Sequence, residues 1–160
     1  MDSVFKKMNL KDHNEVFVID APESFNANIQ RLPSKIKVYR NIDNAEEIEF
    51  IVIFVTLKEQ IDASFSQIKS RLAGDALVWY CYPKGSSKKY KCDFNRDNGW
   101  QVLGDAGLEP VRMVAIDEDW SALRFRKVEY VKKMTRRKSM AMSKEGKIKT
   151  KGGVNKNLKK

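Results

Sequence analysis

The segment between positions 84 and 96 holds the residues best suited to bind a ligand. It supplies cations and hydroxyl groups at Lys84, Ser86, Ser87, Lys88 and Arg96. Gly85 permits close approach of the backbone, so that backbone N–H groups and these cations could together hold a phosphate or another anion. The spacing is not that of a Walker A motif. A solvated, flexible loop has the same composition, and both interpretations stay open.

Two other polar turns are expected to face this segment. Asp20–Ser24 follows a short β-rich run, and Thr56–Lys58 follows a longer apolar one. Ligands in open α/β sheets bind beyond the carboxyl ends of the strands, near the point where the strand order reverses. We therefore expect Asp20 and Ser24 to share one crevice with the 84–96 segment, and its ligand to be an anionic small molecule.

Residues for catalysis or metal binding are scarce. His13 is the only histidine, so no Ser-His-Asp set and no histidine-based metal site can be assembled. Cys81 lies in an apolar run and is expected to be buried. Asp117–Asp119 could be a metal or acid–base cluster, but consecutive side chains splay apart in a tight turn, which we favour. The sequence predicts no catalytic residue, no metal ligand and no cofactor.

Two residues near these segments have alternative roles. Asp97 could form an ion pair with Arg96, or it could cap a short helix, which is the role we favour. Trp120, close to Arg124 and Arg126, could stack against a base. Packing of its ring at the edge of the sheet is the more common arrangement, and it is the one we expect.

The elements that must position these residues alternate between strands and helices. Strands are predicted at Glu15–Ile19, Ile36–Arg40, Phe50–Thr56 and Ala76–Tyr82. Helices are predicted after Pro22, between Leu57 and Leu72 with Gly74 as the C-cap, and between Arg96 and Ala106. Residues 1–14 are polar and are expected to form a loop.

A hairpin is predicted to complete the sheet. Val111–Ile116 and Trp120–Arg126 alternate in polarity on either side of the acidic turn, as antiparallel strands do. Strands that alternate with helices imply parallel pairing with right-handed crossovers. The predicted fold class is therefore α/β, a Rossmann-like, doubly wound and mostly parallel sheet closed by an antiparallel C-terminal β-hairpin.

The charge of the chain is concentrated at its C-terminus. The net charge is +10 over 160 residues, yet residues 132–160 contain 12 Lys and Arg residues and one acid, and residues 1–131 are close to neutral. We expect one α/β domain at 1–131 and a disordered basic tail at 132–160. Such a tail binds nucleic acid or another polyanion through phosphate contacts. The candidate residues are Lys132, Lys133, Arg136, Arg137 and Lys138.

The N-terminal segment has no apolar core of the kind found in secretory signals, and the longest apolar run, Phe50–Val55, is too short to span a bilayer. Cytoplasmic localisation without membrane contact is the expectation.

Several blocks, DAPESF, WYCYPKGSSKK, NRDNGW and VAIDEDWSALRFR, together resemble a bacterial family known only as a domain of unknown function. The resemblance covers roughly residues 10–127 and implies a fold more than an activity. At the level of the fold, βα units closed by an antiparallel hairpin are similar to class I S-adenosylmethionine-dependent methyltransferases. Those enzymes carry a glycine-rich turn after the first strand, whereas the turn here, Asp20–Phe25, has no glycine.

Three hypotheses about function follow. The leading one is a small α/β binding module without catalytic activity, because a catalytic set and the glycine turn are both absent. The first alternative is an S-adenosylmethionine-dependent methyltransferase with an atypical cofactor turn, and only this alternative implies a cofactor. The second is a nucleic-acid-binding protein that acts through the basic tail.

Overall fold

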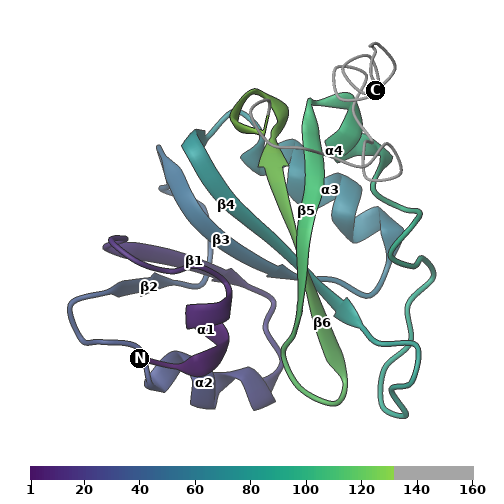
Figure 1. Cartoon of the computed structure of the whole chain (residues 1–160), viewed down its shortest axis with the longest axis horizontal. Helices are drawn as coiled ribbons and strands as arrows, with labels where there is room; N and C mark the ends of the chain where they lie inside the picture. Colours follow the sequence, from purple (N-terminus) through teal and green to yellow (C-terminus); the bar gives the residue numbers. More distant parts are fainter. Residues whose placement is uncertain (132–160) are drawn as a thin grey trace.

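The central feature of the fold is one six-stranded sheet, seen in a computed structural model that describes residues 1–131 (Figure 1). Across the sheet the strands follow the order β2-β1-β3-β4-β6-β5. Their bounds are β1 Glu15–Ile19, β2 Lys37–Tyr39, β3 Ile48–Phe54, β4 Leu72–Pro83, β5 Leu108–Ala115 and β6 Trp120–Lys127.

The first four strands are parallel, and the last strand is reversed. β1 pairs in parallel with both β2 and β3, and β3 pairs in parallel with β4. β6 is antiparallel to β4 and to β5, with Leu123 placed opposite Tyr80 on one side and Met113 on the other. This arrangement confirms the predicted fold class. The hairpin joins the sheet through β6, so β5 becomes an edge strand.

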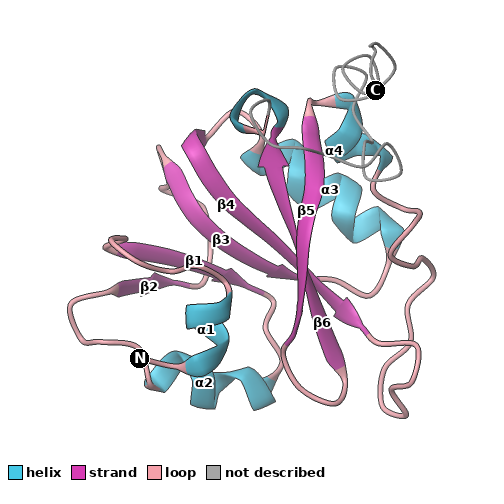
Figure 2. Ribbon diagram, in the orientation of Figure 1, coloured by secondary structure: helices cyan, strands magenta, loops and turns pink. Residues whose placement is uncertain are grey.

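Helices cover both faces of the sheet (Figure 2). α1 (Ser3–Lys7) and α2 (Asn26–Gln30) pack on one face, and α3 (Lys58–Ile68) and α4 (Gln101–Asp105) pack on the other. Two short 3-10 helices, η1 (Glu23–Phe25) and η2 (Val128–Tyr130), complete the described elements. Because β3 is covered on both sides, its sequence is almost continuously apolar rather than alternating.

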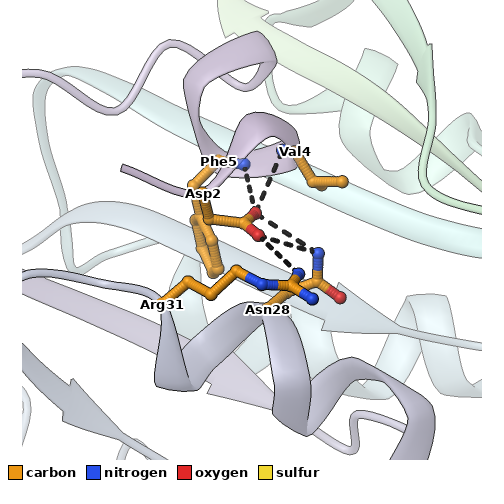
Figure 3. Close-up of polar contacts among 5 residues, drawn as sticks. All are labelled: Asp2, Val4, Phe5, Asn28 and Arg31. Atoms are coloured by element: carbon orange, nitrogen blue, oxygen red, sulfur yellow. Dashed lines mark hydrogen bonds and ion pairs between the residues drawn. The ribbon is translucent and has the colours of Figure 1, made fainter.

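Residues Ser3–Lys7 form the helix α1, with Val4 and Phe5 buried, so the polar loop expected at positions 1–14 is wrong for this part of the segment. The Asp2 carboxylate accepts hydrogen bonds from the backbone N–H groups of Val4 and Phe5, at 3.0 and 3.1 Å, and so caps α1. It also accepts from the Asn28 amide and pairs with Arg31 at 3.2 Å (Figure 3). A fully buried carboxylate thus joins α1 to α2.

β4 begins earlier than the sequence indicates, and Gly74 does not cap a helix. α3 ends at Ile68, and Gly74 lies within β4 with a φ of 55°. The pairing of β4 with β3 shifts between Ile48 and Phe50, so Gly74 belongs to an irregularity in the strand. Asp75, next to it, binds Arg126 of β6 through two hydrogen bonds, which fixes this end of β4 to the hairpin.

Candidate functional site

The turn that follows β1 lies where the order of the strands reverses. β1 is flanked by β2 and β3, and Asp20 is the first residue beyond its carboxyl end. Asp20 has a φ of 57°, in the left-handed region that favours glycine and that aspartate tolerates better than most residues. Its side chain is exposed and has no hydrogen bond or ion pair within residues 1–131. The chain therefore makes this turn without glycine and leaves a free carboxylate at its apex.

The N-terminus of α3, beyond the carboxyl end of β3, is held by two side chains, Gln60 and Asp93. The Gln60 side chain accepts hydrogen bonds from the N–H groups of Thr56 and Leu57, at 2.7 and 3.0 Å. The Asp93 carboxylate accepts from the N–H group of Lys58 at 2.7 Å. An acidic side chain at a helix N-terminus is favourable electrostatically, and here it ties the 84–96 segment to α3.

The opposite end of the same segment is held by the hairpin turn. The Ser87 hydroxyl donates to Asp119 Oδ1 at 2.8 Å and accepts from the backbone N–H of Tyr90 at 3.1 Å. The Asp119 carbonyl accepts from the N–H of Lys84 at 2.8 Å. Asp117 accepts from two backbone N–H groups of the turn, so the acidic cluster is confirmed as a turn.

A row of aromatic rings passes beneath this edge of the sheet. Phe25, Phe54, Trp120 and Tyr90 contact one another in that order, with ring centroids 4.9 to 5.1 Å apart. Trp120 is only 4% exposed, which confirms that it packs in the sheet. The row links the turn at Asp20 to the 84–96 segment through close-packed side chains.

A cavity of about 490 Å³ opens at the carboxyl end of β4. The 84–96 segment forms one wall with Lys84, Lys91 and Arg96, and the hairpin forms another with Met113 and Ser121. This volume lies within the range of small-molecule sites, about 300 to 1,000 Å³.

The floor of this cavity contains a phenol with a poor hydrogen-bond partner. Tyr82 is 6% exposed, and its hydroxyl donates to the thioether sulfur of Met113 at 3.4 Å, a weak acceptor. Burial raises the pKa of Tyr82 above its ordinary value of 10, and the charge of Arg96 opposes the change. The phenol therefore stays protonated at neutral pH and can donate.

The structure separates the predicted ligand-binding residues into two groups. Lys84, Ser87 and Arg96 line the cavity, and Ser87 also holds the loop in place. Four others do not line it, namely Asp20, Ser24, Ser86 and Lys88. The sequence therefore predicts the extent of the crevice wrongly. One side of the cavity is closed by β5 and β6, and not by the Asp20 turn.

The expected capping role of Asp97 is also wrong. α4 begins after Trp100, and no side chain within residues 1–131 caps it. Asp97 instead pairs with Arg96 at 3.5 Å, and both side chains are exposed. Gly99, with a φ of 92°, holds the chain against Phe94 and delays the start of the helix.

The five predicted nucleic-acid residues, Lys132, Lys133, Arg136, Arg137 and Lys138, lie outside the described residues. Among the described residues, no helix combines the length and the apolar character needed to cross a membrane.

Comparison with known proteins identifies relatives by fold only. No family model matches the sequence, and no curated protein matches it, so the family of unknown function remains a prediction. A methyltransferase from Aquifex aeolicus that depends on S-adenosylmethionine matches with a TM-score of 0.56 at 15% identity, over 77% of this chain and 87% of that one. The N-methyltransferase NodS from Bradyrhizobium japonicum matches with a TM-score of 0.47 at 17% identity, over 72% and 85%.

The match to the Aquifex aeolicus structure bears out the fold-level resemblance and corrects the leading hypothesis. The comparison does not favour a non-catalytic binding module, because the solved structure with the higher TM-score of the two is a methyltransferase. The expectation that the chain is not an enzyme is overturned for the same reason. At 15% identity the likeness establishes the fold of this chain, and its activity is a separate question.

Proposed function

We propose that this chain is an S-adenosylmethionine-dependent methyltransferase whose cofactor turn is built on Asp20 instead of a glycine-rich sequence. The observation that carries the proposal is the fold, a parallel sheet closed by a reversed final strand between β4 and β5. The methyltransferase match with a TM-score of 0.56 supports it.

The residues at the reversal of strand order fit such a cofactor. Glycine is needed at this kind of turn for its left-handed conformation and its lack of a side chain. Asp20 adopts the left-handed conformation, and Ala21, which follows it, is small. The Asp20 carboxylate is a free acceptor that would hold hydroxyl or ammonium groups. Pro22 lacks an N–H group, so the side chain of Asp20 would contribute more of the binding than the backbone.

The bound cofactor would supply a methyl group carried on a positively charged sulfur. The chain would bind and orient it through Asp20, beyond the carboxyl end of β1. The capped N-terminus of α3 and the row of aromatic rings below would keep the site rigid.

Replacing Asp20 by Asn is expected to weaken binding of S-adenosylmethionine and S-adenosylhomocysteine about tenfold. Asparagine keeps the shape of the side chain and tolerates the left-handed conformation, but it removes the negative charge. A hydrogen bond to a charged group contributes about 1.5 to 3 kcal/mol, and 1.4 kcal/mol corresponds to tenfold. Isothermal titration calorimetry with both compounds measures the effect.

Glu118→Gln is the matched control, because Glu118 is an exposed carboxylate at the tip of the hairpin turn. It carries the same change in charge, and its affinity for both S-adenosyl compounds should equal that of the unmodified chain. Absence of binding heat with both compounds in the unmodified chain would rule the proposal out. Equal losses in the two variants would remove Asp20 from the site.

We also propose that residues 132–160 form a separate basic tail that binds nucleic acid or another polyanion in the cytoplasm. The excess of Lys and Arg in this segment supports the proposal. Each phosphate contact contributes about 0.9 to the slope of log K against log salt on duplex DNA. Replacing Arg136, Arg137 and Lys138 by Gln should therefore lower the slope by about 3.

Fluorescence anisotropy with a labelled duplex at several salt concentrations measures this slope. Lys132 and Lys133 are the next residues to replace. The double variant Lys88→Gln, Lys89→Gln, which removes charge from the described part of the chain, should leave the slope unchanged. A slope that the triple variant does not alter would show that the tail makes no phosphate contacts.

A further inference from the structure

The charged residues of 1–131 that line the cavity at the end of β4 are all positively charged. Lys84, Lys91 and Arg96 line it, and none of the Asp or Glu residues within 1–131 does. Of the two nearest acids along the segment, Asp93 caps α3, and Asp97 lies at 3.5 Å from Arg96 in an exposed pair. Exposed pairs contribute little, so Arg96 remains available to a ligand.

A second cavity shows that this lining is not a general property of the surface. It has the same volume, about 490 Å³, and lies beside β1 and β2. Glu15, Glu46 and Glu47 line it, and no Lys or Arg residue of the described part of the chain does. Residues 1–131 thus form a cationic cavity and an acidic cavity of equal size, and of these two an anion is attracted to the first.

The uncharged residues of the cationic cavity indicate which other groups its ligand should carry. Phe94 and Met113 provide apolar surface, and the Tyr82 hydroxyl is a buried donor whose acceptor within residues 1–131 is a thioether sulfur. An anionic oxygen is a much better acceptor for this hydroxyl than sulfur. Tyr82 and Phe94 also pack against Trp100, so the apolar floor is rigid.

We propose that this cavity is the acceptor site of the methyltransferase and that it selects small molecules with an anionic group on an apolar body. Lys84, Arg96 and Tyr82 contact the anionic group, and Phe94 and Met113 contact the body. The role as acceptor site rests on the function proposed above, whereas the preference for anions rests on the cavity alone. The cavity is also placed suitably, because Asp93 joins its loop to the carboxyl end of β3.

The test uses the full chain with ¹³C-labelled methionine methyl groups, and benzoate as the probe. Met113 lines the cavity and is 47% exposed, whereas Met8 is buried in the core on the other face of the sheet and serves as an internal control. Benzoate should shift the Met113 signal saturably and leave the Met8 signal in place. Benzyl alcohol has the same body without charge and should bind at least about tenfold more weakly. Phenyl phosphate, compared with benzoate, distinguishes a phosphate from a carboxylate ligand.

Two double variants that each remove two positive charges distinguish specific contacts in the cavity from general electrostatic attraction. Lys84→Gln with Arg96→Gln should weaken benzoate binding about tenfold or more, because it removes charged contacts. Lys88→Gln with Lys89→Gln changes the same loop by the same charge outside the cavity lining, and it should retain the affinity within about twofold. Equal losses in both variants, or equal shifts with benzyl alcohol, would overturn the preference for anions.

Calorimetry with S-adenosylmethionine on the Lys84, Arg96 variant tests the role of the cavity. An unchanged affinity is expected, since the proposed cofactor site is the Asp20 turn. A matching loss of S-adenosylmethionine and benzoate binding would make the cavity the cofactor site and overturn the acceptor role. Benzoate binding in a chain that binds no S-adenosyl compound would refute the methyltransferase and leave the anion site standing. If benzoate does not shift the Met113 signal, the anion site is refuted and the proposed methyltransferase function is not.

Discussion

Replacing Trp100 by Ala should lower the free energy of unfolding by about 4 kcal/mol, within the 3 to 5 kcal/mol usual for buried Trp. Trp100 is fully buried, and its ring contacts Tyr80, Tyr82, Phe94 and Phe125 at centroid distances of 5.2 to 5.7 Å. The substitution would leave a large hole between β4 and the 84–96 segment. Urea denaturation followed by far-ultraviolet circular dichroism measures the change.

The same substitution should also abolish the response of Met113 to benzoate, because Tyr82 and Phe94 lose their support. Trp100→Phe is the control. It retains an aromatic ring but loses the hydrogen bond from the indole N–H to the Asn95 carbonyl, 3.0 Å long, and should cost about 1 to 2 kcal/mol. A loss below 1 kcal/mol for Trp100→Ala would contradict the central position of this ring.

Replacing Asp2 by Ala should destabilise the fold by about 2 to 3 kcal/mol, because the carboxylate that caps α1 and also bonds Asn28 is lost. Loss of a helix cap costs about 1 kcal/mol in general, and the cost lies toward the upper end of about 1 to 3 kcal/mol when the N–H groups left without a partner are buried. Those groups belong to Val4 and Phe5, which are both buried. Chemical denaturation of the two chains under identical conditions gives the difference.

Arg31→Gln is the control for this prediction. The Arg31 side chain is 62% exposed, so its ion pair with Asp2 is screened by water and should contribute less than about 1 kcal/mol. Asp2→Asn can still cap α1, so its loss of stability should lie between the losses caused by Arg31→Gln and Asp2→Ala. If Arg31→Gln cost as much as Asp2→Ala, the stabilisation would come from the ion pair rather than from the cap.

The fold was predictable from the sequence because its central strands are covered on both faces. The apolar run of β3 follows directly from its burial on both faces. The helix α1 was missed although the signal existed, since Asp2 precedes Val4, Phe5 and Met8 at helical spacing. Gly74 was misplaced because Leu72, in β4, continues the spacing of α3 by coincidence.

The candidate site was only partly predictable. Lys84 and Arg96 belong to one loop, and their composition indicates an anion. Met113 and Ser121 could not be placed there, because their position depends on the insertion of β6 between β4 and β5. The carboxylate at Asp20 was recognised as a candidate, but its left-handed backbone is set by the tertiary structure and leaves no sign in composition.

The same insertion has a consequence for the way the chain folds. β4 is the longest of the described strands, with 12 residues of mainly buried positions, and on one edge its residues Val78–Pro83 pair with β6, the last of the described strands in chain order. An apolar edge of this length is a template for association with other chains while it stays unpaired. The β5–β6 hairpin is a local structure of the kind that forms in microseconds, whereas parallel pairing of distant strands is slower. During synthesis from the N-terminus, β4 therefore stays open on that side until the final strand is available, and docking of the hairpin is the step that closes it.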